Sequence, residues 1–286
     1  QNRQSIVQII IMIIIRIIFL LVLIPLSSWS ETISGRMVDS ETGVALPYVN
    51  IGVLGGERGT VSNEQGYFHL DLTDLMPEST IRFSFIGYEN HDATVEKLSG
   101  LGGNLGEVKL TPITLEMQAV LVFPREFKEK VVGNPHPPAM MRGGFAEDSL
   151  GYELGIRIKI RKRPTLLKTL TLHGVTTTYD TVFYRLNVYE MEDKQPGKNI
   201  LTKPIYITLT DFEQLADITI DLTSHHIVVH DDFAITLEYV KELGEGDLQF
   251  STGILNGKIF YRKTSQAPWH SAPFGLGMSV LIRYEK

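Results

Sequence analysis

Between Ile33 and Leu72 the chain is a series of short extended runs separated by clusters of glycine, asparagine and aspartate. Such clusters stand at residues 39–43, 55–59 and 63–66. These residue types adopt tight-turn conformations, including positive φ, at little cost, so they favour turns between neighbouring strands. The pattern therefore predicts a small, rigid β-sandwich in which no catalytic pocket is evident.

The order of these turn residues is also specific. The residues that stand in this order are Gly35, Val38, Asp39, Thr42, Gly43, Leu46, Pro47, Val49, Ile51, Gly59, Thr60, Ser62, Asn63, Gly66, Tyr67, Phe68 and Leu70. Together with strand-like runs at 81–88 and 107–115, they resemble the carboxypeptidase-like regulatory domain, a transthyretin-like Greek-key sandwich, and we place this domain at residues 31–116. The resemblance implies an accessory module of the bacterial envelope that has no active site of its own.

The composition of the chain argues against several classes of function. The chain has 286 residues with a formal net charge of −6, and nucleic-acid binding usually needs a basic surface. It has no cysteine, which excludes disulfides, thiol nucleophiles and cysteine-ligated zinc. None of the eight histidines has glutamate three positions later, so the sequence lacks the zinc motif expected of a metallocarboxypeptidase. We expect a protein that is not an enzyme and needs no cofactor.

Residues 1–30 differ from the rest of the chain. A polar start containing Arg3 precedes an apolar run from Ile6 to Leu26, and small residues follow at Ser28 and Ser30. This layout predicts a cleaved secretory signal. An uncleaved membrane anchor is the alternative, because the apolar run is close to the roughly 20 residues that span a bilayer. The protein is accordingly expected in the periplasm or at the outer membrane, with membrane contact only through this segment.

The second half of the chain returns to a strand pattern. Proline and glycine punctuate residues 117–148, which we interpret as a linker. Strict alternation of apolar and basic residues from Glu153 to Arg161 then begins a set of about nine short strands within 149–286. These predict a second antiparallel β-sandwich, similar in outline to a galactose-binding-like jelly roll, with one helical turn possible at 211–216. The predicted fold is therefore all-β, with two domains.

Three imidazoles and two carboxylates between Ser224 and Asp232 form a candidate metal site, in which His226, His230 and Asp232 are the potential ligands. In a straight strand, however, His226 and His230 would lie about 13 Å apart along one face, too far to share one ion. We therefore favour a strand with edge histidines followed by a turn.

A second candidate site lies near the C-terminus. Trp269 and Tyr261 could stack on a sugar ring, while Arg262 and His270 could supply hydrogen bonds. The alternative is that Trp269 closes the end of the sandwich core.

The basic residues of the run from Arg157 to Arg163 could contact an acidic polysaccharide, lipid headgroups or a partner protein. We favour instead a solvated edge strand, on which positive charge deters edge-to-edge pairing.

These observations favour a non-catalytic, exported binding or scaffolding protein whose partner is an envelope protein or a glycan, and not a nucleic acid. A carbohydrate-binding module that uses loops of the second sandwich is the alternative. A metal-dependent hydrolase is the remaining hypothesis, and only the histidine cluster and the family name motivate it.

Overall fold

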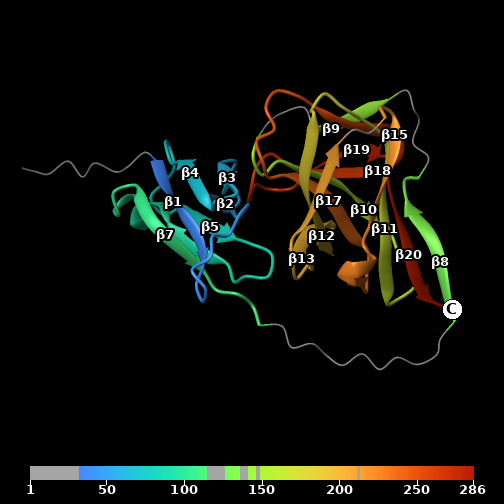
Figure 1. Cartoon of the computed structure of the whole chain (residues 1–286), viewed down its shortest axis with the longest axis horizontal. Coiled ribbons are helices and arrows are strands. Elements are labelled where there is room, and N and C mark those ends of the chain that lie inside the picture. Colours follow the sequence, from blue (N-terminus) through green and yellow to red (C-terminus); the bar gives the residue numbers. More distant parts are fainter. Residues whose placement is uncertain (1–31, 115–125, 136–140, 146–148, 211–212) are drawn as a thin grey trace, which may run out of the picture.

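The computed structural model describes residues 32–114, 126–135, 141–145, 149–210 and 213–286. Nearly all regular structure in these ranges is β-strand, arranged as two domains that lie side by side (Figure 1). The predicted all-β class is confirmed. The signal or anchor predicted at residues 1–30 lies outside the described residues. Within them, no helix has both the length and the apolar character needed to cross a bilayer.

The N-terminal domain packs two small sheets face to face. One sheet has the order β4-β1-β7 and the other β3-β2-β5-β6, and β1 pairs with β7 in parallel. Alternate residues of the strands face inward, as in β4, where Phe68 and Leu70 are buried and their neighbours are exposed. The elements are β1 (Thr32–Asp39), β2 (Asn50–Val53), β3 (Gly59–Val61), β4 (Tyr67–Asp71), β5 (Thr80–Ser84), β6 (His91–Thr94), α2 (Val95–Ser99) and β7 (Asn104–Leu110).

The sequence pattern did not predict β6 and α2. Strand β6 buries only Ala93, so its alternation is too weak to recognise. Helix α2 is a single short turn, and the Thr94 hydroxyl caps it by accepting a 3.3 Å hydrogen bond from the Lys97 backbone N–H. Val95 and Leu98 anchor the turn in the core of the sandwich. Short elements of this kind depend on tertiary packing more than on intrinsic propensity.

The C-terminal domain is a larger sandwich in which every strand pairing is antiparallel. Its strands are β8 (Phe127–Gly133), β9 (Arg142–Phe145), β10 (Glu153–Ile158), β11 (Thr165–Thr177), β12 (Thr181–Glu192), β13 (Gln195–Asn199), β14 (Ile205–Thr210), β15 (Ala216–Asp221), β16 (Val228–Val229), β17 (Phe233–Tyr239), β18 (Leu248–Arg262), β19 (His270–Leu276) and β20 (Met278–Glu285), with the 3₁₀ turn η1 (Thr223–His225) before β16.

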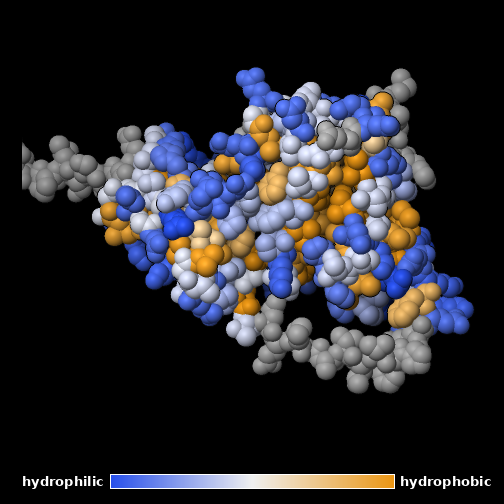
Figure 2. Space-filling model, viewed as in Figure 1, coloured by the Kyte–Doolittle hydropathy of each residue, from blue (hydrophilic) through white to orange (hydrophobic). Residues whose placement is uncertain are grey.

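One layer of this sandwich runs β13-β12-β17-β10-β18, and the other runs β11-β20-β8. The long strands β11 and β18 pair at their ends and so join the layers. A single apolar core fills the space between them, with Tyr184, Phe250 and Tyr239 among its fully buried residues. Figure 2 shows apolar residues gathered over the middle of this domain, with hydrophilic residues around them.

Several segments differ from the expected pattern. Strands β8 and β9 lie inside the predicted linker 117–148 and pair with β20 and β18, so this segment is not a linker throughout. Residues 190–199 form a hairpin between strands β12 and β13. Asp193 and Lys194 both adopt positive φ there, and the two-residue turn pairs β12 with β13. Residues 248–262 form one long strand, β18, where the sequence pattern predicts only short strands. The possible helical turn at 211–216 lies partly outside the described residues.

The two domains share an apolar contact. Tyr48 of the N-terminal domain packs against Phe183 and Tyr206 of the C-terminal domain, with ring centroids 5.2 and 5.3 Å apart. Tyr48 is buried although it lies in a surface turn of its own domain. Val61 and Val240 complete the buried cluster. The interface therefore covers side chains that either domain alone would leave exposed to water.

Candidate functional site

A row of charged residues crosses four adjacent strands of the C-terminal domain. Arg185 on β12 stands directly opposite Glu238 on β17, Glu238 stands opposite Glu153 on β10, and Glu153 stands opposite Arg262 on β18. All four side chains are buried. Directly opposed positions in antiparallel strands bring side chains close together, so the register alone assembles this row.

Hydrogen bonds connect the row. Arg185 Nη2 donates to Glu238 Oε2 at 2.7 Å, and Arg262 Nε donates to Glu153 Oε2 at 2.8 Å. Asn187 bridges the two carboxylates, since its Nδ2 lies 2.9 Å from Glu153 Oε1 and 2.7 Å from Glu238 Oε2. Each buried carboxylate therefore has its own arginine, and the two like charges are separated by an amide.

The two carboxyl groups respond differently to this environment. Burial raises the pKa of Glu153, and the nearby Glu238 carboxylate adds to the increase while Arg262 opposes it. For Glu238, burial also works against ionisation, but Arg185 and Arg262 together hold its pKa below the usual range. Burial likewise raises the pKa of the Tyr189 hydroxyl, which donates to Glu153. All four charged side chains of the row are buried inside the sheet, and their nearest charged neighbours are one another.

The row also reaches the other domain. Arg185 Nη1 donates a 2.6 Å hydrogen bond to the backbone carbonyl of Tyr48, and Nη2 donates to the Asn50 side chain. A second contact involves Gly52, where an added Cβ would lie 2.2 Å from the Ser265 carbonyl oxygen. Glycine is needed there because the backbones of the two domains approach so closely. The charged row thus serves as a clamp between the domains.

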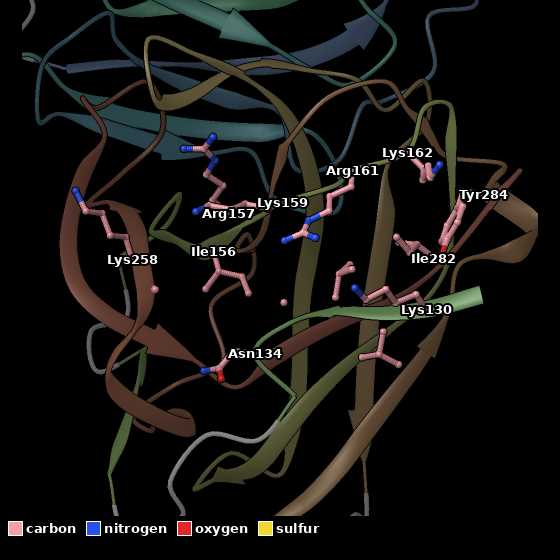
Figure 3. Close-up of a pocket in the computed structure, with 14 residues that line it drawn as sticks. Lys130, Asn134, Ile156, Arg157, Lys159, Arg161, Lys162, Lys258, Ile282 and Tyr284 are labelled. Atoms are coloured by element: carbon pink, nitrogen blue, oxygen red, sulfur yellow. The ribbon is translucent and has the colours of Figure 1, made fainter. Parts of the chain in front are cut away.

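A separate feature of the C-terminal domain is a groove of about 610 Å³, which we call the cationic groove. Figure 3 shows side chains from several segments around it, with Arg161 and Lys130 extending toward the middle and Lys258 on another wall. None of the described residues that line it is acidic. They are Lys130, Val131, Val132, Gly133, Asn134, Ile156, Arg157, Lys159, Arg161, Lys162, Gly257, Lys258, Ile282 and Tyr284.

Asp232 fixes one wall of this groove. Its Oδ2 accepts a 2.6 Å hydrogen bond from Arg157, and its Oδ1 accepts a 3.0 Å hydrogen bond from the backbone N–H of Ile160. Ile160 is buried, so its neighbours Lys159 and Arg161 are held on the exposed side. The groove wall is therefore positioned by the core and by one carboxylate, while its cations remain in contact with water.

Comparison with known families adds one finding about the first domain. Residues 33–122 match the family model of the CarboxypepD_reg-like domain. The N-terminal domain is a CarboxypepD_reg-like domain. This confirms the family resemblance drawn from its turn residues. A comparison with curated proteins gives no match.

Solved structures similar to the whole chain include the full-length major pilin SpaD from Corynebacterium diphtheriae, with 9% identity and a TM-score of 0.21. That match covers 85% of this chain, which spans 64% of the length of SpaD. The major pilin subunit BcpA of Bacillus cereus has 11% identity, covers 87% of this chain and 68% of its own, and has a TM-score of 0.19. Scores this low do not establish a shared arrangement of strands.

The residues predicted to contact a sugar do not form one site. Arg262 is buried, pairs with Glu153 and lies 4.9 Å from the centroid of the Trp269 ring. Tyr261, the neighbour of Arg262 on β18, stacks on His270 at 5.4 Å between ring centroids. Because successive side chains in a strand point to opposite faces, these two pairs are on opposite sides of the sheet. Arg262 therefore does not present hydrogen-bond donors to a ligand beside Tyr261.

The histidine cluster is not a straight strand. His226 follows the turn η1 with φ of 50°, and its ring bonds to the Ser224 carbonyl at 3.0 Å. His230 is exposed, and Asp232 is engaged with Arg157. Within the part of the chain that the structure describes, no group of three potential ligands is close enough to hold a metal ion. The strand expected at His226 is therefore wrong, because the turn η1 places this residue outside regular strand pairing.

Sequence reasoning missed the role of the charged row and placed the basic run on a solvated edge. A signal for the row does exist. Glu238 stands in the otherwise mostly apolar run Phe233–Tyr239, and Arg185 stands in the middle of a long strand pattern. Charged residues at such positions are rarely buried unless they are paired. The sequence could have indicated that partners exist, but only strand order decides which residues pair.

Proposed function

We propose that this protein is a non-catalytic, exported binding and scaffolding protein of the cell envelope. The CarboxypepD_reg-like domain supports an accessory role, since it resembles modules that have no active site of their own. The layout of residues 1–30 supports export. Among the described side chains, the strongly perturbed buried acids are committed to arginines inside a sheet and are not in a cleft, which does not suit acid–base catalysis.

One observation supports the scaffolding role most directly, namely the clamp between the domains. Arg185 satisfies a buried carboxylate of its own sheet and a backbone carbonyl of the other domain at the same time. Exposed ion pairs at the rim, such as Lys263 with Glu57 at 3.2 Å, surround the buried contact. An interface with a buried polar centre of this kind holds two domains in one orientation. A rigid two-domain body is what a scaffold or a docking module requires.

The test is fractionation combined with cross-linking in cells that express the full chain. We expect the protein in the envelope fraction, with a mature chain that begins near Glu31, and cross-linked to a discrete envelope component. Retention in the cytosol with residues 1–30 intact would contradict export. Recovery of the envelope protein without any cross-linked component would contradict the binding and scaffolding role.

A carbohydrate-binding function is the second candidate, and the cationic groove favours it. The groove is concave, has polar and apolar walls and remains open to solvent. Trp269 supports this function less, because its ring packs against Tyr189 and Arg262.

A further inference from the structure

We propose that the cationic groove binds an anionic polysaccharide, whose acidic groups pair with lysine and arginine side chains along its walls. This inference deepens the binding role proposed above and rests on it. It assigns the ligand class and the surface, and it makes the basic run near Arg161 a binding surface instead of a solvated edge.

The first argument is charge. Five basic residues of the groove have no carboxylate within ion-pair distance among the described residues, namely Lys130, Lys159, Arg161, Lys162 and Lys258. The chain as a whole is acidic, with a formal net charge of −6, so this concentration of positive charge is local. A hollow lined by one sign of charge raises the local concentration of ligands of the opposite sign.

The second argument is the contrast with another hollow of the molecule. This hollow has about 600 Å³ and lies where the two domains meet, and its walls include Glu64, Lys241 and Glu242. Lys241 already pairs with Glu64 there. Mixed and internally neutralised charge does not select an anion, so the cationic groove is the better candidate.

The third argument is shape. The floor of the groove includes Ile156 and Ile282, both buried, with the half-buried Tyr284 at its side (Figure 3). A flat membrane surface could meet the outermost lysines but would not reach this floor. A chain of sugar rings can do both, because each ring has an apolar face that packs on aromatic and aliphatic groups.

The fourth argument is hydrogen-bond chemistry. Lysine and arginine side chains donate hydrogen bonds and accept none. A polysaccharide that bears carboxylates or sulfates, with many ring and hydroxyl oxygens, supplies acceptors for such a lining. An acidic peptide strand would instead need a free strand edge, and lysines at the edge, such as Lys128 and Lys130 on β8, discourage strand addition. The lining therefore favours a glycan over a peptide.

The experiment measures binding of the full chain to acidic oligosaccharides by calorimetry at low salt. The probes are oligogalacturonate and a heparin oligosaccharide, with fully methyl-esterified oligogalacturonate as the neutral match. We expect binding to the acidic probes, little binding to the esterified one, and an affinity that falls as salt increases. Absence of binding to both acidic probes would overturn the proposal, and so would equal binding of the esterified match.

The variant that tests the site is Lys159→Gln/Arg161→Gln, which removes two charges without touching the Asp232 contacts. We expect its affinity to fall by about twofold to thirtyfold, since two exposed ion pairs are lost and each contributes roughly 0.2–1 kcal/mol. The matched control is Lys97→Gln/Lys109→Gln, which removes two exposed charges from the other domain and should leave affinity unchanged. Equal losses in both variants would show a general charge effect and would overturn the assigned groove.

Three further probes separate the other partner classes. Oligothymidylate, polyglutamate and anionic phospholipid vesicles each carry negative charge on a different backbone. If any of them binds more tightly than both acidic oligosaccharides, and loses affinity in the groove variant, the glycan assignment is wrong. If oligosaccharides do not bind while cross-linking in cells still finds an envelope component, this inference fails and the proposed function stands.

Discussion

The Arg185 guanidinium donates a 2.6 Å hydrogen bond to the backbone carbonyl of Tyr48, across the boundary between the two domains and 137 positions along the chain. The same guanidinium pairs with Glu238, whose side chain is fully buried. One residue therefore links the internal electrostatics of the C-terminal sheet to the docking of the N-terminal domain. Loss of this residue should affect both properties together.

Replacement of Arg185 by methionine should strongly destabilise the protein. The change keeps apolar volume but leaves the Glu238 carboxylate buried without its closest cation. Breaking a buried pair in this way typically costs about 3–5 kcal/mol. Urea unfolding followed by circular dichroism measures the loss. The matched control is Lys241→Gln, which breaks an exposed pair with Glu64 and should cost no more than about 1 kcal/mol.

A second variant separates the orphaned charge from lost packing. In Arg185→Met/Glu238→Met no buried carboxylate remains at this position, so part of the lost stability should return. If the double variant is no more stable than Arg185→Met, the charge pairing is not what makes Arg185 important.

A glycine at the interface should be required for domain docking. Gly52→Ala would place a Cβ 2.2 Å from the Ser265 carbonyl oxygen, and a backbone atom cannot move aside as a flexible side chain can. We expect a larger radius of gyration in small-angle scattering and faster proteolysis between the domains. Gly143→Ala is the matched control, since its nearest neighbour would be 3.7 Å away. An unchanged scattering curve for Gly52→Ala would contradict the close approach.

Trp269 should stabilise the fold whether or not it contacts a ligand. Its ring lies 5.6 Å from the Tyr189 ring and 4.9 Å from the Arg262 guanidinium carbon. An aromatic pair contributes roughly 0.5–1.5 kcal/mol and a cation–π contact roughly 0.5–2 kcal/mol, so Trp269→Ala should lower the free energy of unfolding by about 1–3.5 kcal/mol. Thermal and urea unfolding measure this loss. A glycan array should change little for this variant, and a lost signal at unchanged stability would instead support the loop site.

The Asp39 carboxylate should make the N-terminal domain sensitive to acid. The Thr42 backbone N–H and the Tyr88 hydroxyl hold the pKa of Asp39 below its usual range. Since the folded pKa is lowered, its contribution to stability is complete above the unfolded value of about 4 and disappears as pH falls through the folded pKa. Asp39→Asn should therefore be less stable than the natural chain at pH 7, and the difference should shrink toward low pH. Urea midpoints across this range measure it, and a constant difference would contradict the linkage.

The turns of the N-terminal domain were predictable because they depend on local chemistry. Asp39 Oδ1 accepts hydrogen bonds from the backbone N–H groups of Glu41 and Thr42, and Asn63 Oδ1 accepts from those of Gln65 and Tyr67. Such contacts lie within a few residues and so leave a recognisable pattern. This confirms the interpretation of Asp39 and Asn63 as turn formers.

The sites were less predictable, because their residues are distant in sequence. Lys258 and Lys130 line one groove although β18 and β8 lie far apart along the chain. Alternation correctly placed Arg157 and Lys159 on one side of a strand, but it cannot tell whether that side faces open water or a groove. In the same way, adjacency in sequence suggested that Tyr261 and Arg262 act together, whereas the pleat of β18 separates them.

The sequence by itself determined the all-β class, the turn chemistry of the first sandwich and the family to which residues 33–122 belong, because these depend on short-range preferences and side-chain alternation. Only the tertiary structure decided that Glu153, Arg185, Glu238 and Arg262 form a row, that this row clamps the domains, and that basic residues of separate strands surround one groove. Strand order and register bring such residues together, and both are set by long-range packing that no local pattern records.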